Sequence, residues 1–347
     1  MRKLAATLAA LCLCAAQTGA HGGSGLSHGV SHGHLDPQND LSKVEIKTTK
    51  VAGNVYMLEG AGGNIGVSAG PDGVLIVDDQ FAPLAEKIRA AFRGLGTGQL
   101  RFVLNTHYHG DHTGSNAVFG AEAPIVAHAN VRKRLASGVR VLGEDVKPAP
   151  KEALPVITYD TTVSVHFNGE EIRVVHFPAG HTDGDSVVFF TASNVIHMGD
   201  DFFTGRFPFV DVDNGGSVEG LARNVGEIIS KAPAGVKIIP GHGPLSTLED
   251  LRAFHAMLTE TTGLVRARLR AGLTLEQVKA EGLPDKWKEW GSGFINTQTW
   301  IELVYRSIQK DAGKPAAFRP SLTPRDAAAR LSLAGERWLD FRVAEVD

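Results

Sequence analysis

Cysteine is almost absent from this sequence of 347 residues, and the two that occur, Cys12 and Cys14, lie close to the N-terminus. The segment around them begins with the charged pair Arg2-Lys3, continues with an apolar run (residues 4–16) and ends in small residues. This order is typical of a secretory signal peptide, which we expect to span residues 1–20 and to be cleaved after Ala20. The mature protein would then contain no cysteine, so no disulfide could stabilise it and no thiolate could bind a metal.

The chain also lacks a long hydrophobic run. The apolar part of the leader is shorter than the roughly 20 residues that a membrane-spanning helix needs. Its flanks are those of a signal peptide. We therefore expect a periplasmic or secreted protein without membrane contact after cleavage; an uncleaved N-terminal anchor is the alternative.

Neither sign of charge dominates the sequence. There are 35 Lys and Arg residues and 38 Asp and Glu residues, which gives a formal net charge of -3. No basic run occurs that would bind a phosphate backbone. Nucleic acid is therefore excluded as an expected partner.

Residues 21–43 have little apolar content and many glycines, which predicts a disordered linker. Four of the 14 histidines of the chain fall in this segment, namely His21, His28, His32 and His34. A metal-collecting tail is the alternative to a plain flexible linker.

The remaining sequence divides into a folded domain (residues 44–270) and an extension (residues 271–347) that we expect to be helical. In the domain, short apolar segments typical of strands alternate with segments of helical periodicity, which predicts mixed α and β structure. The expected strands are 54–58, 66–69, 74–77, 101–105, 125–127, 163–167, 172–177, 187–190 and 195–198, and the expected helices are 83–95, 131–135, 218–231, 249–270 and 297–309. Asn168-Gly169 predicts a tight hairpin turn. Residues 138–155 show no periodicity, and we expect them to form a long loop that could overhang a functional site.

The densest group of potential metal ligands lies between Thr106 and His112. It contains His107, His109, Asp111 and His112. Neutral imidazole and carboxylate are good ligands for Zn²⁺, and a turn lets neighbouring side chains reach two adjacent metal positions. The group follows an expected buried strand, where rigid scaffolds usually carry functional residues. The alternative is a polar loop with surface histidines.

Three further candidates also follow expected strands and adjoin glycine. They are His181 after Gly180, Asp200 after Gly199 and His242 after Gly241, the last of which follows a further apolar segment at residues 236–239. The same placement at strand ends predicts that all three join the site formed by residues 107–112.

The ordered motifs His-x-His-x-Asp-His, Gly-His-Thr, Gly-Asp-x-x-Phe and Pro-Gly-His-Gly resemble the signature of the metallo-β-lactamase superfamily over about residues 51–258. The resemblance implies an α+β fold, a four-layer αβ/βα sandwich. It also implies two Zn²⁺ ions per chain. The first would be held by His107, His109 and His181, and the second by Asp111, His112 and His242. Asp200 would bridge the ions or complete the second site, and Asp111 would act as the catalytic residue that orients a metal-bound hydroxide for attack on a carbonyl.

Single positions separate the branches of this superfamily. His109 stands where the flavodiiron branch has a glutamate, which favours zinc hydrolysis over iron redox chemistry. Asp200 stands where another branch has a zinc-binding cysteine, and Phe203 stands where that branch has a lysine that binds the substrate carboxylate. Arg206 is a candidate to replace that lysine.

Several neighbours of the expected ligands have possible supporting roles. Thr106, Thr113 and Asp183 are placed to orient the imidazoles or the loop. Asp201 is expected to point away from the metals and to accept hydrogen bonds. Tyr108 would face the pocket or pack beneath it.

These observations predict a secreted dinuclear zinc hydrolase that acts on a small molecule, with β-lactamase-like opening of a cyclic amide as the first hypothesis. The second hypothesis is a glyoxalase-type thioesterase or lactonase with the same chemistry. The third is a periplasmic metal-binding accessory protein without turnover.

Overall fold

A computed structural model of the protein describes residues 40–96 and 98–313. The expected signal peptide, almost all of the expected linker and the C-terminal part of the extension lie outside these residues. Among the helices described, none is both long and apolar enough to cross a membrane.

The first sheet has seven strands, which lie in the order β1-β2-β3-β4-β5-β6-β9. Their bounds are Lys47–Ala52 (β1), Val55–Glu59 (β2), Ile65–Gly70 (β3), Gly73–Val77 (β4), Leu100–Leu104 (β5), Ile125–His128 (β6) and Ile157–Tyr159 (β9). Strands β1 to β4 form an antiparallel meander, whereas β4, β5, β6 and β9 are parallel. Side chains alternate between the two faces of β4, since Leu75 and Val77 enter one core and Val74 and Ile76 enter another.

The second sheet has six strands in sequence order. Their bounds are Thr162–Phe167 (β10), Glu170–His176 (β11), Ser186–Phe190 (β12), Val195–His197 (β13), Lys237–Ile239 (β14) and Ser246–Thr247 (β15). Only β13 and β14 are parallel neighbours. The predicted turn between β10 and β11 is confirmed, because Asn168 and Gly169 both have positive φ angles, of 52° and 81°, as a type I′ turn requires.

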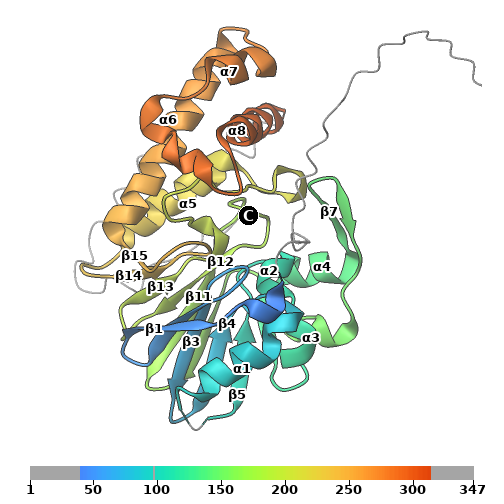
Figure 1. The fold of residues 1–347 in the computed structure, drawn as a ribbon, viewed down its shortest axis with the longest axis vertical. Helices are drawn as coiled ribbons and strands as arrows, with labels where there is room; N and C mark the ends of the chain where they lie inside the picture. The colour runs from blue at the N-terminus through green and yellow to red at the C-terminus, as the bar shows by residue number, and fades with distance from the viewer. Residues whose placement is uncertain (1–39, 97, 314–347) are drawn as a thin grey trace, which may run out of the picture. The chain divides into compact units, whose positions relative to one another are not determined.

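Helices cover the outer face of each sheet (Figure 1). Those that follow strands of the first sheet are α1 (Ala85–Arg93), α2 (Gly110–Thr113), α3 (Asn116–Phe119) and α4 (Ala129–Ser137), and those that come later are α5 (Val218–Lys231), α6 (Leu248–Arg270), α7 (Leu275–Glu281) and α8 (Thr297–Ala312). Short 3₁₀ turns are η1 (Leu41–Lys43), η2 (Ala82–Leu84), η3 (Lys151–Ala153), η4 (Gly199–Asp201), η5 (Val212–Asn214), η6 (Asp285–Trp287) and η7 (Glu289–Ser292).

Three hydrophobic cores separate the four layers. One joins α1 to the first sheet, one lies between the sheets, and one joins the second sheet to α5, α6 and α8. On β12, Val188 and Phe190 face the first sheet, while Val187 and Phe189 face the helices. The expected four-layer αβ/βα sandwich is therefore confirmed.

The described part of the extension packs on this framework. Trp300 of α8 is fully buried, stacks on Phe207 at 5.4 Å and donates a hydrogen bond from Nε1 to Thr261 Oγ1 of α6 at 3.0 Å. Residues 273–308 thus share a core with α5 and α6. The boundary that we expect at residue 270 stays a prediction.

The expectation that residues 138–155 lack regular structure is wrong. Val139–Val141 (β7) and Glu144–Val146 (β8) form a separate two-stranded hairpin. Its turn places Leu142 and Gly143 at φ angles of 50° and 85°. Leucine rarely adopts this left-handed conformation, and each strand has only three residues, so neither a turn signal nor a periodicity could reveal the hairpin.

Candidate dinuclear metal site

The seven expected ligands lie where strands of both sheets end. The loop after β5 carries His107 and His109, and α2 directly continues it with Asp111 and His112. From the second sheet come His181 between β11 and β12, Asp200 in η4 after β13, and His242 after β14. The structure therefore brings together all seven residues that the sequence predicted, and it does so from two separate sheets.

A first group of ligand atoms is formed by His107, His109, His181 and Asp200, all of them buried. His181 Nε2 lies 2.8 Å from His109 Nδ1 and 3.4 Å from Asp200 Oδ2. His107 Nε2 lies 3.8 Å from the same carboxylate oxygen. A tetrahedral Zn²⁺ with bonds of about 2.0–2.1 Å would set its ligand atoms about 3.3 Å apart, so this group has the size of a single metal position.

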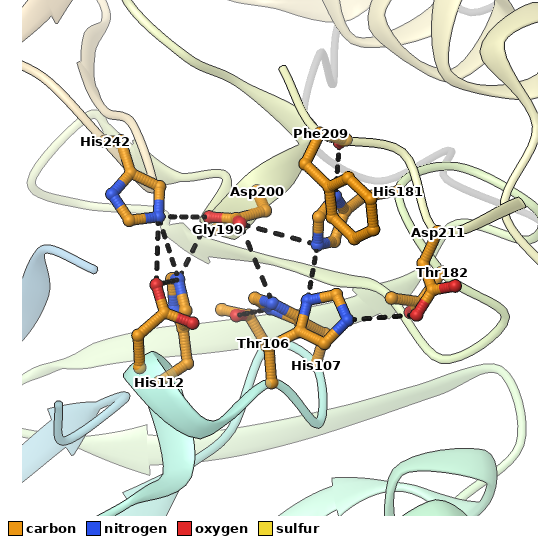
Figure 2. A network of polar contacts seen from close by, with 12 residues as sticks. Thr106, His107, His112, His181, Thr182, Gly199, Asp200, Phe209, Asp211 and His242 are labelled. Carbon is orange, nitrogen blue, oxygen red and sulfur yellow. Dashed lines mark hydrogen bonds and ion pairs between the residues drawn. The ribbon is translucent and has the colours of Figure 1, made fainter. Parts of the chain in front are cut away.

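A second group is formed by Asp111, His112 and His242. The Nε2 atoms of His112 and His242 are 3.4 Å apart, and Asp111 Oδ2 lies 3.2 Å from His242 Nε2. The other carboxylate oxygen of Asp200, Oδ1, faces this group at 3.0 Å from His112 Nε2 and 3.3 Å from His242 Nε2. Figure 2 shows Asp200 between the two sets of imidazoles. One carboxylate thus contributes an oxygen to each group.

The protonation of the first group fits a divalent cation. Burial lowers the pKa of His181 to about 4 and holds the pKa of His107 well below its usual value. Both imidazoles are neutral at pH 7, which is the form that binds a metal. The buried atom His107 Nε2 has no hydrogen-bond partner. Such atoms are rare in folded proteins unless an ion or water completes them.

The second group attracts positive charge. Burial alone would lower the pKa of His242, but the carboxylates of Asp200 and Asp111 raise it to about 9. Burial also opposes the protonation of His112, and there too the surrounding carboxylates, Asp200 first, raise the pKa well above its usual value. A site that favours a proton so strongly is suited to a divalent cation in its place.

The outward ring nitrogens of four ligands are held by the protein. His107 Nδ1 lies 3.0 Å from Thr106 Oγ1, and His181 Nδ1 lies 2.7 Å from the carbonyl oxygen of Phe209. His112 Nδ1 lies 2.7 Å from Asp78 Oδ2, and His109 Nε2 lies 3.2 Å from Asp211 Oδ2. These contacts fix the rings so that the other nitrogen of each points into the site. Figure 2 shows His107, His112 and His181 in this arrangement around Asp200.

Sequence reasoning found Thr106 but missed Asp78 and Asp211. Asp78 also accepts hydrogen bonds from the Thr106 amide and hydroxyl, both at 2.8 Å. Its position directly after β4 was an available signal. Asp211 also accepts a hydrogen bond from the Tyr108 hydroxyl. It is 102 residues away from His109 in sequence, so no local pattern could pair the two.

The other supporting residues have varied roles. Thr113 donates to the carbonyl oxygen of His109 at 3.1 Å, which braces the loop. Asp183 pairs with Arg134 at 2.7 Å and so steadies the following loop rather than an imidazole. Asp201 accepts a hydrogen bond from the His181 amide at 3.3 Å, as expected.

The two groups open into a cavity of about 580 Å³. Its walls include Gly62, Phe81, Tyr108, Val139, Val141, Asp145, Val146, Lys147, Phe203, Arg206, Phe207, Phe209, Phe294 and Ile295, besides His109, Asp111, Asp200 and His242. Phe203 stacks on His242 with ring centroids 4.9 Å apart. As expected, residues of the 138–155 segment overhang the site, although they do so as a hairpin. The cavity is mostly apolar, with charged groups at few points.

Residues 48–269 match the family model of the metallo-beta-lactamase superfamily. This span is more than half of the chain, and the protein therefore belongs to this superfamily, as its motifs predicted. The family and the two ligand groups together define a metal-dependent hydrolase.

Solved structures share the fold at low identity. DIM-1 metallo-beta-lactamase is 17% identical with a TM-score of 0.54, and the match covers 63% of this chain and 99% of that one. A metallo-beta-lactamase from Pontibacter korlensis is 15% identical with a TM-score of 0.53, covering 62% of this chain and 99% of that one. The sec-alkylsulfatase Pisa1 from Pseudomonas sp. is 15% identical with a TM-score of 0.56, covering 80% of this chain but 52% of the alkylsulfatase. At these identities the likeness establishes the fold alone.

Proposed function

We propose that this protein is a dinuclear zinc hydrolase that opens cyclic amides of the β-lactam type. The observation that carries the proposal is the position of Asp200, whose two oxygens face two separate groups of imidazoles. Every candidate ligand atom is nitrogen or oxygen, which suits Zn²⁺. His107, His109 and His181 would hold the first ion, Asp111, His112 and His242 the second, and Asp200 would contact both.

Two such ions, when bound, lower the pKa of a shared water and polarise the scissile carbonyl. The rest of the chemistry falls to the protein. Burial would raise the pKa of Asp111, but His112 and His242 lower it below the usual value. Asp111 is therefore ionised at neutral pH and lies on the cavity wall, where its carboxylate can accept a hydrogen bond from the attacking water and orient it.

Arg206 is the group that we propose for binding a substrate carboxylate. It is exposed on the cavity wall, in the loop that also carries Phe203. A guanidinium binds a carboxylate through paired hydrogen bonds. Arg206→Ala should raise KM about tenfold for an anionic β-lactam, with a smaller effect on kcat, because the lost contact is made in ground state and transition state alike.

Zinc dependence tests the proposal directly. The purified protein should contain two equivalents of zinc and hydrolyse a chromogenic cephalosporin. A chelator should abolish the activity and added Zn²⁺ should restore it. No turnover of penicillins, cephalosporins or carbapenems by the zinc-loaded protein would refute β-lactam hydrolysis.

A thioester or lactone is the second candidate. The observation in its favour is Phe203, an apolar side chain stacked on His242 where a carboxylate-binding lysine would favour β-lactams. The likeness to an alkylsulfatase, which covers more of this chain than the lactamase matches do, adds sulfate esters to the panel. Comparison of kcat/KM on a β-lactam, a lactone, a thioester and an alkyl sulfate would rank these classes.

We also propose that the protein is periplasmic or secreted. The apolar leader ending at Ala20 supports this location. N-terminal sequencing of protein from the periplasm should begin at His21. Retention of residue 1 in a membrane fraction would favour an anchor instead.

A further inference from the structure

Two large apolar side chains are exposed at the cavity. Phe294 is 53% exposed and Val146 is 46% exposed, and both belong to the cavity wall. Among the described residues, the other large apolar side chains with comparable exposure, Val156 and Ile157, are not part of that wall. Exposed apolar surface beside a reactive centre is typical of a ligand-binding site.

The β7–β8 hairpin presents three valines to the cavity. Val139 pairs with Val146 across the hairpin, so these two side chains lie on one face with Val141 and its partner Glu144, while Arg140 and Asp145 form an ion pair at 3.3 Å. On the shared face the three valines line the cavity and Glu144 does not. Val141 is buried in the core that includes the second sheet. Asn214 donates a hydrogen bond to the carbonyl oxygen of Arg140 at 2.9 Å, which attaches the hairpin to the main body.

The segment between η7 and α8 supplies the other apolar residues of this part of the cavity wall, Phe294 and Ile295. Ile295 is buried in the core, and Asn296 caps α8 by accepting a hydrogen bond from the Thr299 amide at 3.0 Å. These contacts fix the backbone on the C-terminal side of Phe294. On the N-terminal side, the carbonyl oxygen of Trp290 accepts a hydrogen bond from the Phe207 amide at 2.9 Å.

The hydrogen bond from the Phe207 amide to Trp290 connects the extension to the site, because Phe207 belongs to the same loop as Phe203 and Arg206. The family match ends at residue 269, so Phe294 and Ile295 lie outside it. The extension is therefore joined to the loop beside the metal ligands and supplies part of the cavity wall. The contacts that hold the backbone on both sides of Phe294 reduce the entropy cost of placing its side chain against a substrate.

We propose that the β7–β8 hairpin and Phe294 form an acyl-selecting wall, and that the protein prefers substrates whose non-reacting part is an extended apolar chain or ring. This inference rests on the proposed function, because it places the hydrolysed group at the ligand cluster and the apolar part against Val139, Val146 and Phe294. Phe294 and Val146 are specificity-determining residues and are not catalytic.

Binding of n-alkyl carboxylates tests the wall without turnover. We would titrate the zinc-loaded full chain with acetate, butanoate, hexanoate and octanoate by calorimetry. Each added methylene should tighten binding up to about fourfold, the factor that corresponds to about 0.8 kcal/mol per buried CH₂. In Phe294→Ala, and in Val146→Ala, octanoate binding should weaken about fivefold while acetate binding changes less than twofold.

Val156→Ala is the matched control, because Val156 is 69% exposed and lies outside the cavity wall. It should bind the series as the unchanged protein does, and all variants should retain the same zinc content. Affinity independent of chain length, or an equal response of Phe294→Ala and Val156→Ala, would overturn the inference. Hydrolysis is measured separately: turnover without chain-length dependence removes the wall alone, whereas chain-length dependence without turnover of any panel substrate removes the proposed function and leaves the wall.

Discussion

Replacement of Asp200 by asparagine is the most direct test of the metal site. Asparagine keeps the shape of the side chain but removes a negative charge from between the two ligand groups. Asp200 Oδ1 lies 3.0 and 3.3 Å from the second-group nitrogens, whereas Oδ2 lies 3.4 and 3.8 Å from those of the first group. The first group also keeps three imidazoles, a complete set of protein ligands for zinc. The affinity for the second metal should therefore fall more than the affinity for the first.

The expected size follows from electrostatics. A unit charge about 4 Å from another contributes about 4 kcal/mol at an effective dielectric constant of about 20, or roughly a thousandfold in affinity. Competition with a chromophoric chelator should show one zinc bound with nearly unchanged affinity and the second weakened by two to three orders of magnitude. Two equivalents bound as tightly as in the unchanged protein would refute the assignment of Asp200 as a ligand.

Further predictions concern residues around the site and the core. Asp78→Asn should weaken zinc binding about 10- to 100-fold, measured by the same competition, because it releases the ring of His112; unchanged affinity would contradict this. Burial, aided by the stacked His128, lowers the pKa of His176 to about 4, against about 6.5 in an unfolded chain. Because the unfolded chain binds a proton here more readily than the folded protein, the free energy of unfolding decreases as the pH falls from about 6.5 towards 4. His176→Gln removes this contribution, so its free energy of unfolding should decrease by about 3 kcal/mol less over that range. The free energy of unfolding would be measured by urea titration at several pH values between 4 and 7. An equal fall with pH in both proteins would refute the prediction. Trp300→Ala should cost about 3–5 kcal/mol of stability; a loss below about 1 kcal/mol would mean that the extension is not integral to the core.

Much of the fold was predictable because burial imposes a period on the sequence. The helix expected over residues 218–231 coincides with α5, whose buried positions follow helical spacing. Strand β1 was not expected, since it lies at a sheet edge and only one of its six residues, Val51, is buried, so no apolar alternation marks it. Pattern reasoning therefore succeeds where an element must bury one face and fails where it need not.

The same distinction applies to the site. The ligands lie within short motifs, so the resemblance to the superfamily could assign each of them to one of two metal positions. Their supports come from elsewhere: Asp211 reaches His109 from the loop between β13 and α5, and the carbonyl oxygen of Phe209, in the same loop, reaches His181. Backbone carbonyls have no sequence signature at all. The contacts that orient a ligand imidazole thus form only when the layers pack together, and no sequence pattern shows them.

The arrangement of the ligands gives the metals a structural consequence. Each group draws on both sheets: His107 and His109 meet His181 and Asp200 in the first, and Asp111 and His112 meet His242 in the second. A bound ion would therefore cross-link the two halves of the sandwich at the edge where the cavity opens. The only cysteines are Cys12 and Cys14, so the folded layers contain no thiol that could form a disulfide across the same edge. Because an unfolded chain does not hold these ligands together, metal binding adds to the stability of the folded sandwich. The residues that would bind the metals for catalysis would therefore also hold the two sheets together.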